Sequence, residues 1–348
     1  MKITRKPSGD RAVLSETATV ADGGQLSAAD GASQSSPSVA PSASAIAAVA
    51  TASAAATTSP AAVELASVVA KPRVGRRLVR PADDCDHEGI LSGKKALVFG
   101  VANDHSIAWG IAKALHDQGA EVGFSSMASL IKRRVRPLAA SIGSTFVEGC
   151  DVRDDDEIRK VFERYHAREG NLDILVHAVA YAEKEDLAGH FTSTSRDGFH
   201  TAFDISVYSL IAMAREAQPY MNPGASIMTM TYYGAEKVVP HYNVMGVAKA
   251  ALEATTRYLA ADLGPAGIRV NAISAGPVRT LSAHGIAGFR SMHSAFAEVT
   301  PLRRHITIED VAGTAVYLAS SLSGQTTGEV IYVDGGFNIL GLPVQDEE

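Results

Sequence analysis

From Lys95 to Gly336 the chain alternates between short apolar strand patterns and longer helix patterns, and this alternation constrains its fold more than any other feature. Strands are predicted at residues 96–100, 121–125, 144–152, 171–180, 225–231, 268–274 and 329–336. Helices are predicted between them, at about 107–119, 129–143, 154–170 and 204–221, from Tyr242 and from Thr307. Strands that alternate with helices form parallel sheets. The sequence therefore predicts a single-domain α/β fold, a doubly wound parallel sheet of the Rossmann type with helices on both faces.

One long segment interrupts the alternation. Residues 274–302 have weak periodicity and directly follow a predicted strand. Long connections at the carboxyl end of a strand in α/β folds usually carry function. We therefore predict a substrate-binding loop at about 276–302, within a folded domain that spans residues 89–345.

The first 88 residues have a different composition. They consist mainly of Ala, Ser, Thr, Val, Pro and Gly, with very few aromatic or long aliphatic side chains. Such a segment buries too little apolar surface to offset the entropy lost on ordering, so we predict a disordered tail. A transit peptide is the alternative, because the tail is rich in Ser and poor in acidic residues, although its middle lacks arginines. The basic stretch 71–81 is interpreted as a solvated linker rather than a nucleic-acid contact.

Composition narrows the class of protein further. The formal net charge is -6, and no apolar run approaches the roughly 20 residues that span a bilayer. The chain has two cysteines, Cys85 and Cys150, which provide neither a disulfide framework nor a metal cluster. We therefore predict a cytoplasmic protein without a metal, a membrane partner or a nucleic-acid partner.

The first strand–helix junction reads FGVANDHSIAWGIA and is a candidate phosphate-binding loop. Gly100 allows close backbone approach, and a helix opens at Ser106 and Ile107, where its N-terminus favours an anion. The spacing is not GxGxxG, and a glycine at a strand end is also ordinary turn chemistry. This loop alone is weak support for nucleotide binding.

Further candidate cofactor contacts lie where the other strands end. Asp151 and Val152 follow the third strand, and small residues from His177 to Ala182 follow the fourth. Turn formation and packing explain each of these separately, but together they line one crevice at the carboxyl edge of the predicted sheet. The second strand ends without an acidic residue for the adenosine ribose, and the basic run 132–134 follows it. NADH and NADPH therefore both remain possible on these grounds.

Tyr242 and Lys249 are the strongest catalytic candidates. Seven helical residues are almost two turns, so both side chains share one face, about 10 Å apart along the axis. A phenol can donate a hydrogen bond to an oxyanion that forms during hydride transfer, and an ammonium can hold ribose hydroxyls. A packing tyrosine and a surface lysine on an amphipathic helix would be the alternative without the surrounding sheet.

The motifs GVANDHSIAWGIA, YYGAE at Tyr232, YNVMGVAKAALE at Tyr242, RVNAISAGPVRT, ITIEDV and GEVIYVDGGF together carry a resemblance. From about Leu91 to Pro343 the chain resembles the bacterial NADH-dependent enoyl-acyl-carrier-protein reductases, a divergent branch of the short-chain dehydrogenase superfamily. Ordinary members of that superfamily have Tyr and Lys four residues apart, whereas the spacing of seven is specific to this branch.

The resemblance implies roles for named residues. Tyr242 would donate to an enolate, Lys249 would bind the ribose, and Tyr232 would be a second tyrosine on the substrate side. Ala182 would lie beside the acyl substrate, and Met127 stands where the family commonly has a glutamine beside the adenosine ribose. The remaining implied NADH contacts are Gly100, Ser106, Ile107, Asp151, Val152, Val179, Val278, Arg279, Thr280, Leu281 and Ser282.

The resemblance also implies an enoyl-acyl-carrier-protein substrate, reduction of its trans-2 double bond in fatty acid biosynthesis, and a homotetramer. Two alternatives stay open. A reductase of ketoacyl or other carbonyl substrates would share the fold and cofactor, although it should carry a catalytic Ser and the shorter Tyr–Lys spacing. An inactive NAD-binding regulatory module is the other, although the intact Tyr232, Tyr242 and Lys249 argue against it.

Overall fold

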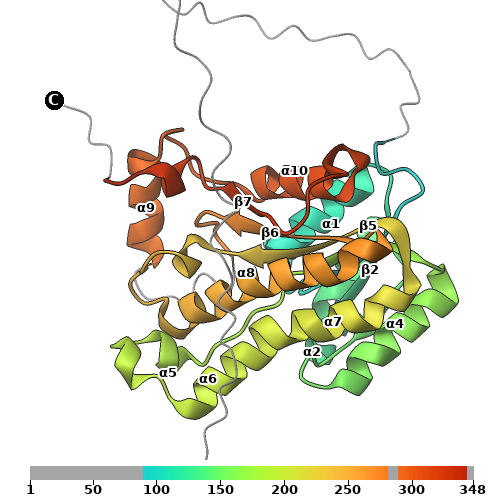
Figure 1. Cartoon of the computed structure of the whole chain (residues 1–348), viewed down its shortest axis with the longest axis horizontal. Helices are drawn as coiled ribbons and strands as arrows, with labels where there is room; N and C mark the ends of the chain where they lie inside the picture. The colour runs from blue at the N-terminus through green and yellow to red at the C-terminus, as the bar shows by residue number, and fades with distance from the viewer. Residues whose placement is uncertain (1–88, 281–288, 343–348) are drawn as a thin grey trace, which may run out of the picture. The chain divides into compact units, whose positions relative to one another are not determined.

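A computed structural model describes residues 89–280 and 289–342 of the chain (Figure 1). The predicted tail at 1–88 lies outside the described residues, as do Leu281 and Ser282. None of the helices in the described part is both long and apolar enough to cross a membrane.

A seven-stranded, wholly parallel sheet forms the centre of the domain. Its strands lie in the order β3-β2-β1-β4-β5-β6-β7. Their bounds are β1 Lys95–Phe99, β2 Glu121–Ser126, β3 Val147–Gly149, β4 Leu172–His177, β5 Met221–Thr231, β6 Arg269–Ala275 and β7 Val330–Val333. The predicted fold class is confirmed.

Helices cover both faces of this sheet, as Figure 1 shows. One apolar core joins the sheet to helices α1 and α10, which pack against each other, and to α3; the other joins the opposite face to α4, α7 and α8. The bounds of these helices are α1 Ile107–Asp117, α3 Arg136–Ser141, α4 Asp155–Glu169, α7 Ser209–Ala217, α8 Asn243–Leu263 and α10 Ile308–Ala319. The strands between the two cores are buried on both sides, and in β1 and β4 this burial appears in the sequence as the continuous apolar runs ALVF and ILV.

The order of the strands places a crevice at the carboxyl edge of the sheet. The chain proceeds from β1 outward to β2 and β3, and then crosses back to β4 on the other side of β1. At such a switch point the loops after adjacent strands diverge, and the gap between them is where open α/β sheets bind ligands. Phe99 at the end of β1 is level with Ser125 of β2 and His177 of β4, so all three strands end together.

The predicted helix at 204–221 is wrong in its bounds. Helix α6 (Arg196–Phe203) begins earlier, a π-helical turn (Asp204–Tyr208) joins it to α7, and a 3-10 turn at Gln218–Tyr220 ends the run. Strand β5 then begins at Met221, before the predicted start. Its register shifts between Leu172 and Ile174 of β4. Pro223 and Gly224 lie at this irregularity, and such residues are tolerated in a strand at a bulge.

Two other segments also differ from their predicted form. The long loop contains helix α9 (Phe289–Val299), whose apolar residues Phe289, Met292, Phe296 and Val299 have a helical spacing that the weak overall periodicity concealed.

The predicted helix at 129–143 is divided into α2 (Ala128–Leu130), a π-helical turn (Ile131–Val135) and α3. Pro137, near the start of α3, lacks the N–H that a continuous α-helix would need. A short helix, α5 (Lys184–Leu187), was not predicted.

Helix α10 begins with a capping box, and this box allows a stability test. The Thr307 hydroxyl accepts from the Asp310 N–H, and the Asp310 carboxylate accepts from the Thr307 N–H. Replacing Thr307 by Ala should lower the free energy of unfolding by about 1 kcal/mol in urea titrations, because one cap is lost. Thr314→Ala in the same helix is the control and should change it by less than about 0.5 kcal/mol. Equal effects of the two variants would show that the box contributes nothing.

Candidate active site

Strand β5 and helix α8 bring the three predicted catalytic side chains to the carboxyl edge of the sheet. Tyr232 directly follows the last residue of β5, and Tyr242 is the N-cap residue of α8, which carries Lys249 two turns later. The rings of Tyr232 and Tyr242 meet edge to face, with centroids 5.0 Å apart and planes at 76°. Two phenols from different elements therefore lie together.

The backbone around Tyr242 is held in an unusual conformation. His241 and Asn243 flank it with φ angles of 63° and 38°. Positive φ is rare in residues other than glycine, and it persists where the surrounding structure enforces it, often at functional sites. The start of α8 is thus built to present Tyr242 in one orientation.

Two glycines make room for this tyrosine. A Cβ added at Gly234 would lie 2.5 Å from Cδ1 of Tyr242 and 3.2 Å from Cδ1 of Tyr232. A Cβ added at Gly246, one turn into α8, would lie 2.8 Å from the carbonyl oxygen of Gly234. The loop after β5 can therefore pack against α8 only because both positions lack a side chain.

Burial keeps both phenols protonated. Tyr242 is 8% exposed, and its pKa is raised above the usual value by burial and by the neighbouring Tyr232. Burial raises the pKa of Tyr232 to about 12. At neutral pH both side chains are therefore hydrogen-bond donors, which is the form needed to stabilise an oxyanion.

Lys249 is 6% exposed, and its Nζ atom donates to the carbonyl oxygen of Met230 at 2.7 Å. Burial lowers its pKa to about 8, and the neighbouring Glu253 opposes that shift. At neutral pH the ammonium form still predominates. Its remaining two donors are suited to the hydroxyls of a ribose.

The loop after β1 has the form of a phosphate cradle. Gly100 has a φ of 99°, and a Cβ there would lie 2.1 Å from the carbonyl oxygen of Ala178. The Ser106 hydroxyl accepts from the N–H groups of Ala102 and Asn103, which closes the turn before α1 begins at Ile107. Close backbone approach and the N-terminus of an 11-residue helix fit the charge of a dinucleotide pyrophosphate.

The predicted adenosine contacts are arranged differently from one another. Asp151 lies two residues beyond the end of β3, and its carboxylate binds Arg153 at 2.6 Å, which lowers its pKa. Its N–H donates to Glu157. Val152 is buried, whereas Met127, which follows β2, is 61% exposed. The carboxylate of Asp151 is therefore paired, and Val152 and Met127 contribute apolar surface beyond the ends of these two strands.

Other predicted contacts follow β4 and β6. Val179 and Ala182 are half-buried after β4. After β6, Val278 is buried, Arg279 is exposed and Thr280 is half-buried. A cavity of about 360 Å³ adjoins this last group and is lined by Val278, Arg279, His293, His305, Ile306, Thr307, Ile308 and Glu309.

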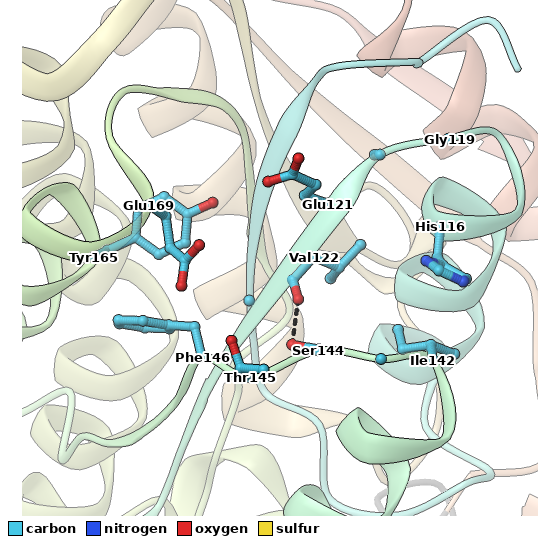
Figure 2. A pocket seen from close by; sticks show the side chains of 13 residues that line it. His116, Gly119, Glu121, Val122, Ile142, Ser144, Thr145, Phe146, Tyr165 and Glu169 are labelled. Carbon is cyan, nitrogen blue, oxygen red and sulfur yellow. Dashed lines mark hydrogen bonds between the residues drawn. The ribbon is translucent and has the colours of Figure 1, made fainter. Parts of the chain in front are cut away.

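A second cavity, of about 370 Å³, lies at the amino ends of β2 and β3 (Figure 2). It is bordered by Glu121 at the start of β2, by Ser144 and Phe146 before β3, and by Tyr165 and Glu169 near the end of α4. The catalytic candidates follow the carboxyl ends of strands. This cavity therefore belongs to the opposite edge of the sheet and is not part of the candidate site.

Sequence reasoning missed the buried polar contacts beneath the site. His177, at the end of β4, is enclosed between the hydroxyls of Thr229 and Ser209, each 2.8 Å from a ring nitrogen. Burial lowers its pKa to about 3, so the ring is neutral. Because the Ser209 hydroxyl donates to Ile205, it accepts from Nε2–H, and Nδ1 accepts from Thr229. The only sequence signal was a histidine at the end of a strand whose other residues, apart from Asp173, are apolar.

Comparison with known proteins gives a consistent result. The family model described as Enoyl-(Acyl carrier protein) reductase matches residues 100–338. Enoyl-[acyl-carrier-protein] reductase [NADH] 1 of Rhizobium meliloti (strain 1021) is 51% identical over 258 residues, which cover 74% of this chain and 95% of that protein. The NADH-dependent enzyme of Aquifex aeolicus (strain VF5) is also 51% identical, over 75% of this chain and 97% of its own length.

Solved structures agree with these sequence matches. The Bacillus cereus enoyl-acyl carrier protein reductase, solved with NADP+ and indole naphthyridinone, has a TM-score of 0.72 and 50% identity, covering 73% of this chain and all of that one. The Aquifex aeolicus enzyme has a TM-score of 0.71 and 51% identity, over the same shares.

The cradle at Gly100 can be tested with a matched pair of variants. Gly100 and Gly143 both have positive φ, but a Cβ at Gly143 would meet nothing within 4 Å. Gly143→Ala should lower the free energy of unfolding by about 1–2 kcal/mol, the cost of left-handed backbone. Gly100→Ala adds a clash with backbone and should lose at least about 3 kcal/mol more, measured by urea unfolding. Similar losses in both variants would refute close approach at Gly100.

Proposed function

The chain belongs to the enoyl-(acyl-carrier-protein) reductase family, and from this membership we propose the roles of its residues in the reaction. The chain is an NADH-dependent oxidoreductase of the short-chain dehydrogenase superfamily. It reduces the trans-2 double bond of enoyl-acyl-carrier-protein thioesters in fatty acid biosynthesis. The ketoacyl reductase and the inactive module that the sequence left open have no support among these relatives.

The pair of buried, protonated tyrosines beside Lys249 is the observation that carries the proposed mechanism. When bound, the reduced nicotinamide supplies a hydride to the β-carbon of the enoyl thioester. The double-bond electrons then move toward the thioester carbonyl, and negative charge develops on its oxygen. The hydroxyl of Tyr242 donates a hydrogen bond to that oxygen. A proton from solvent then reaches the α-carbon, which completes the saturated product.

Tyr232 and Lys249 are assigned supporting roles. The ring of Tyr232 packs edge to face on Tyr242 and excludes water from its phenol. Lys249 holds the ribose hydroxyls, because its ammonium is anchored to Met230 and lies two helical turns from Tyr242. The positive charge also favours the developing enolate.

The remaining cofactor contacts are proposed on the geometry of the crevice. Gly100, Ser106 and Ile107 would hold the pyrophosphate, and Met127, Asp151 and Val152 would hold the adenosine. Val179, Val278, Arg279 and Thr280 would hold the nicotinamide end, and Ala182 would lie beside the acyl chain. Leu281 and Ser282, which lie outside the described residues, are assigned to the nicotinamide end from family membership alone. Since Met127 offers no carboxylate to repel a 2′-phosphate, and a relative was solved with NADP+, we propose NADPH as a second cofactor.

We also propose the wider organisation of the protein. Residues 89–345 form the reductase domain, with the substrate loop at about 276–302, and residues 1–88 form a tail. Two groups of exposed apolar side chains support assembly into a homotetramer: Ile211, Val247 and Tyr258 on α7 and α8, and Tyr317, Leu322 and Ile339 toward the C-terminus. The chain has only two cysteines, which is consistent with a cytoplasmic location.

Replacing Tyr242 by Phe should reduce kcat/KM for crotonyl thioesters by at least about 100-fold, because the enolate loses its donor. The dissociation constant for NADH, measured by fluorescence titration, should stay within about twofold. Tyr220→Phe, directly before the start of β5 and therefore at the opposite edge of the sheet, is the control and should be unaffected. A fully active Tyr242→Phe enzyme would refute this role, and an unsubstituted enzyme that fails to oxidise NADH with enoyl thioesters would refute the function.

Activity should also depend on the charge of Lys249. Its pKa is about 8, so it is charged below that pH and becomes neutral above it. We expect kcat/KM to be level below pH 8 and to fall by about tenfold for each further pH unit once the lysine titrates. The fall of kcat/KM above pH 8 is the alkaline limb of the pH profile. Lys249→Met should lower activity at neutral pH and remove this alkaline limb. A limb that persists in Lys249→Met would have to come from another group.

A further inference from the structure

We propose that Glu253 is a positioning residue for the reductase reaction, one that fixes the place and the charge of Lys249. This inference rests on the proposed role of Lys249 and extends it to a carboxylate that the reaction does not itself consume. Glu253 lies four residues after Lys249 on α8, so it is on the same helix face one turn further along.

Glu253 is joined to the strand that delivers Tyr232. It is 7% exposed, and its Oε1 atom accepts a 2.7 Å hydrogen bond from the hydroxyl of Thr231, the last residue of β5. The preceding residue, Met230, accepts a bond of the same length from Lys249. Two successive turns of α8 are therefore joined to two successive residues of β5, immediately before Tyr232.

This double connection couples the two catalytic elements. Tyr232 is placed by β5, whereas Tyr242 and Lys249 are placed by α8. Van der Waals packing alone would let the helix shift along the strand by fractions of an ångström. Two buried hydrogen bonds at one end of the contact restrict such a shift, and catalytic groups held within about 0.5 Å of their productive positions keep full activity.

The charge of Glu253 also acts on Lys249. Burial disfavours the ammonium, and the carboxylate favours it, since opposite charges stabilise each other. Burial raises the pKa of Glu253 itself, while Thr231, Arg257 and Lys249 lower it. Glu236 acts in the same direction as burial.

The other groups near Lys249 cannot replace this carboxylate. His177 on β4 is neutral, because burial and Lys249 both lower its pKa. Tyr232 and Tyr242 are protonated over the working pH range. Among these groups Glu253 is the one that favours the charged form of the lysine.

Two substitutions separate the effect of the negative charge of Glu253 from the effect of its hydrogen bond with Thr231. Glu253→Gln keeps the size and a carbonyl that can accept from Thr231, but it removes the charge. The alkaline limb of kcat/KM should then move to lower pH by about one unit, and the dissociation constant for NADH should rise at pH 8.

Thr231→Val keeps the charge of Glu253 and removes the hydrogen bond. It should lower kcat by about tenfold through looser alignment, without moving the limb, and Thr231→Ser should restore most of that loss.

The controls make the outcomes separable. Asp262→Asn removes an exposed carboxylate from the same helix and should leave the pH profile unchanged. An unshifted limb in a folded Glu253→Gln enzyme, with unchanged NADH affinity, would overturn the proposal. If Glu253→Gln fails to fold, Thr231→Val and Thr231→Ser decide, and equal activity of these two variants would overturn the proposal. Loss of activity in Tyr242→Phe with none of these effects would leave the proposed function standing without this role for Glu253.

Discussion

The buried ammonium of Lys249 is the constraint on which the arrangement of this site depends. A lysine deep in a protein loses hydration, and it stays charged only where acceptors and an opposite charge compensate. Here the carbonyl of Met230 supplies the acceptor and Glu253 supplies the charge. Because Met230 lies in β5 and Glu253 in α8, compensation requires the strand and the helix to keep one relative position. Stabilising the ammonium of Lys249 thereby fixes the position of α8 relative to β5.

The sheet supplies the rigidity that this geometry needs. Strand β5 lies inside a parallel sheet, with β4 and β6 on either side of it and an apolar core on each face. Its carboxyl end cannot move without disturbing both neighbours, since interiors of this kind are close-packed. The loops after β1, β4 and β6 extend from the same edge, where the strand order reverses. Tight packing below the edge and irregular backbone above it divide the molecule into a scaffold and a site.

Much of this could be predicted from the sequence, because the features involved are local. Alternating apolar runs predicted the sheet, and the helix pattern from Tyr242 predicted α8, which has Tyr242 at its N-cap and Lys249 two turns later. What could not be predicted depends on contacts between residues far apart in the chain. The hydrogen bond from Thr231 to Glu253 joins positions 22 residues apart, and the enclosure of His177 joins three separate elements. Neither of these contacts produces a periodic pattern in the sequence. The bounds of β5 were missed for a similar reason, since Met221 pairs with β4 ahead of the irregularity at Pro223 and Gly224, and those two residues indicate a turn in the sequence.

The spacing of seven acquires a physical meaning from these contacts. A lysine four residues after Tyr242 would lie one turn away, where its charge would act directly on the phenol. Placed two turns away, Lys249 is anchored to the end of β5, and burial, with a smaller contribution from Tyr232, sets the acidity of Tyr242. The phenol therefore stays a firm hydrogen-bond donor while the lysine is free to hold a ribose. Reduction of a carbon–carbon double bond needs such a donor to stabilise an enolate, and a buried phenol whose pKa is raised meets that need without being ionised.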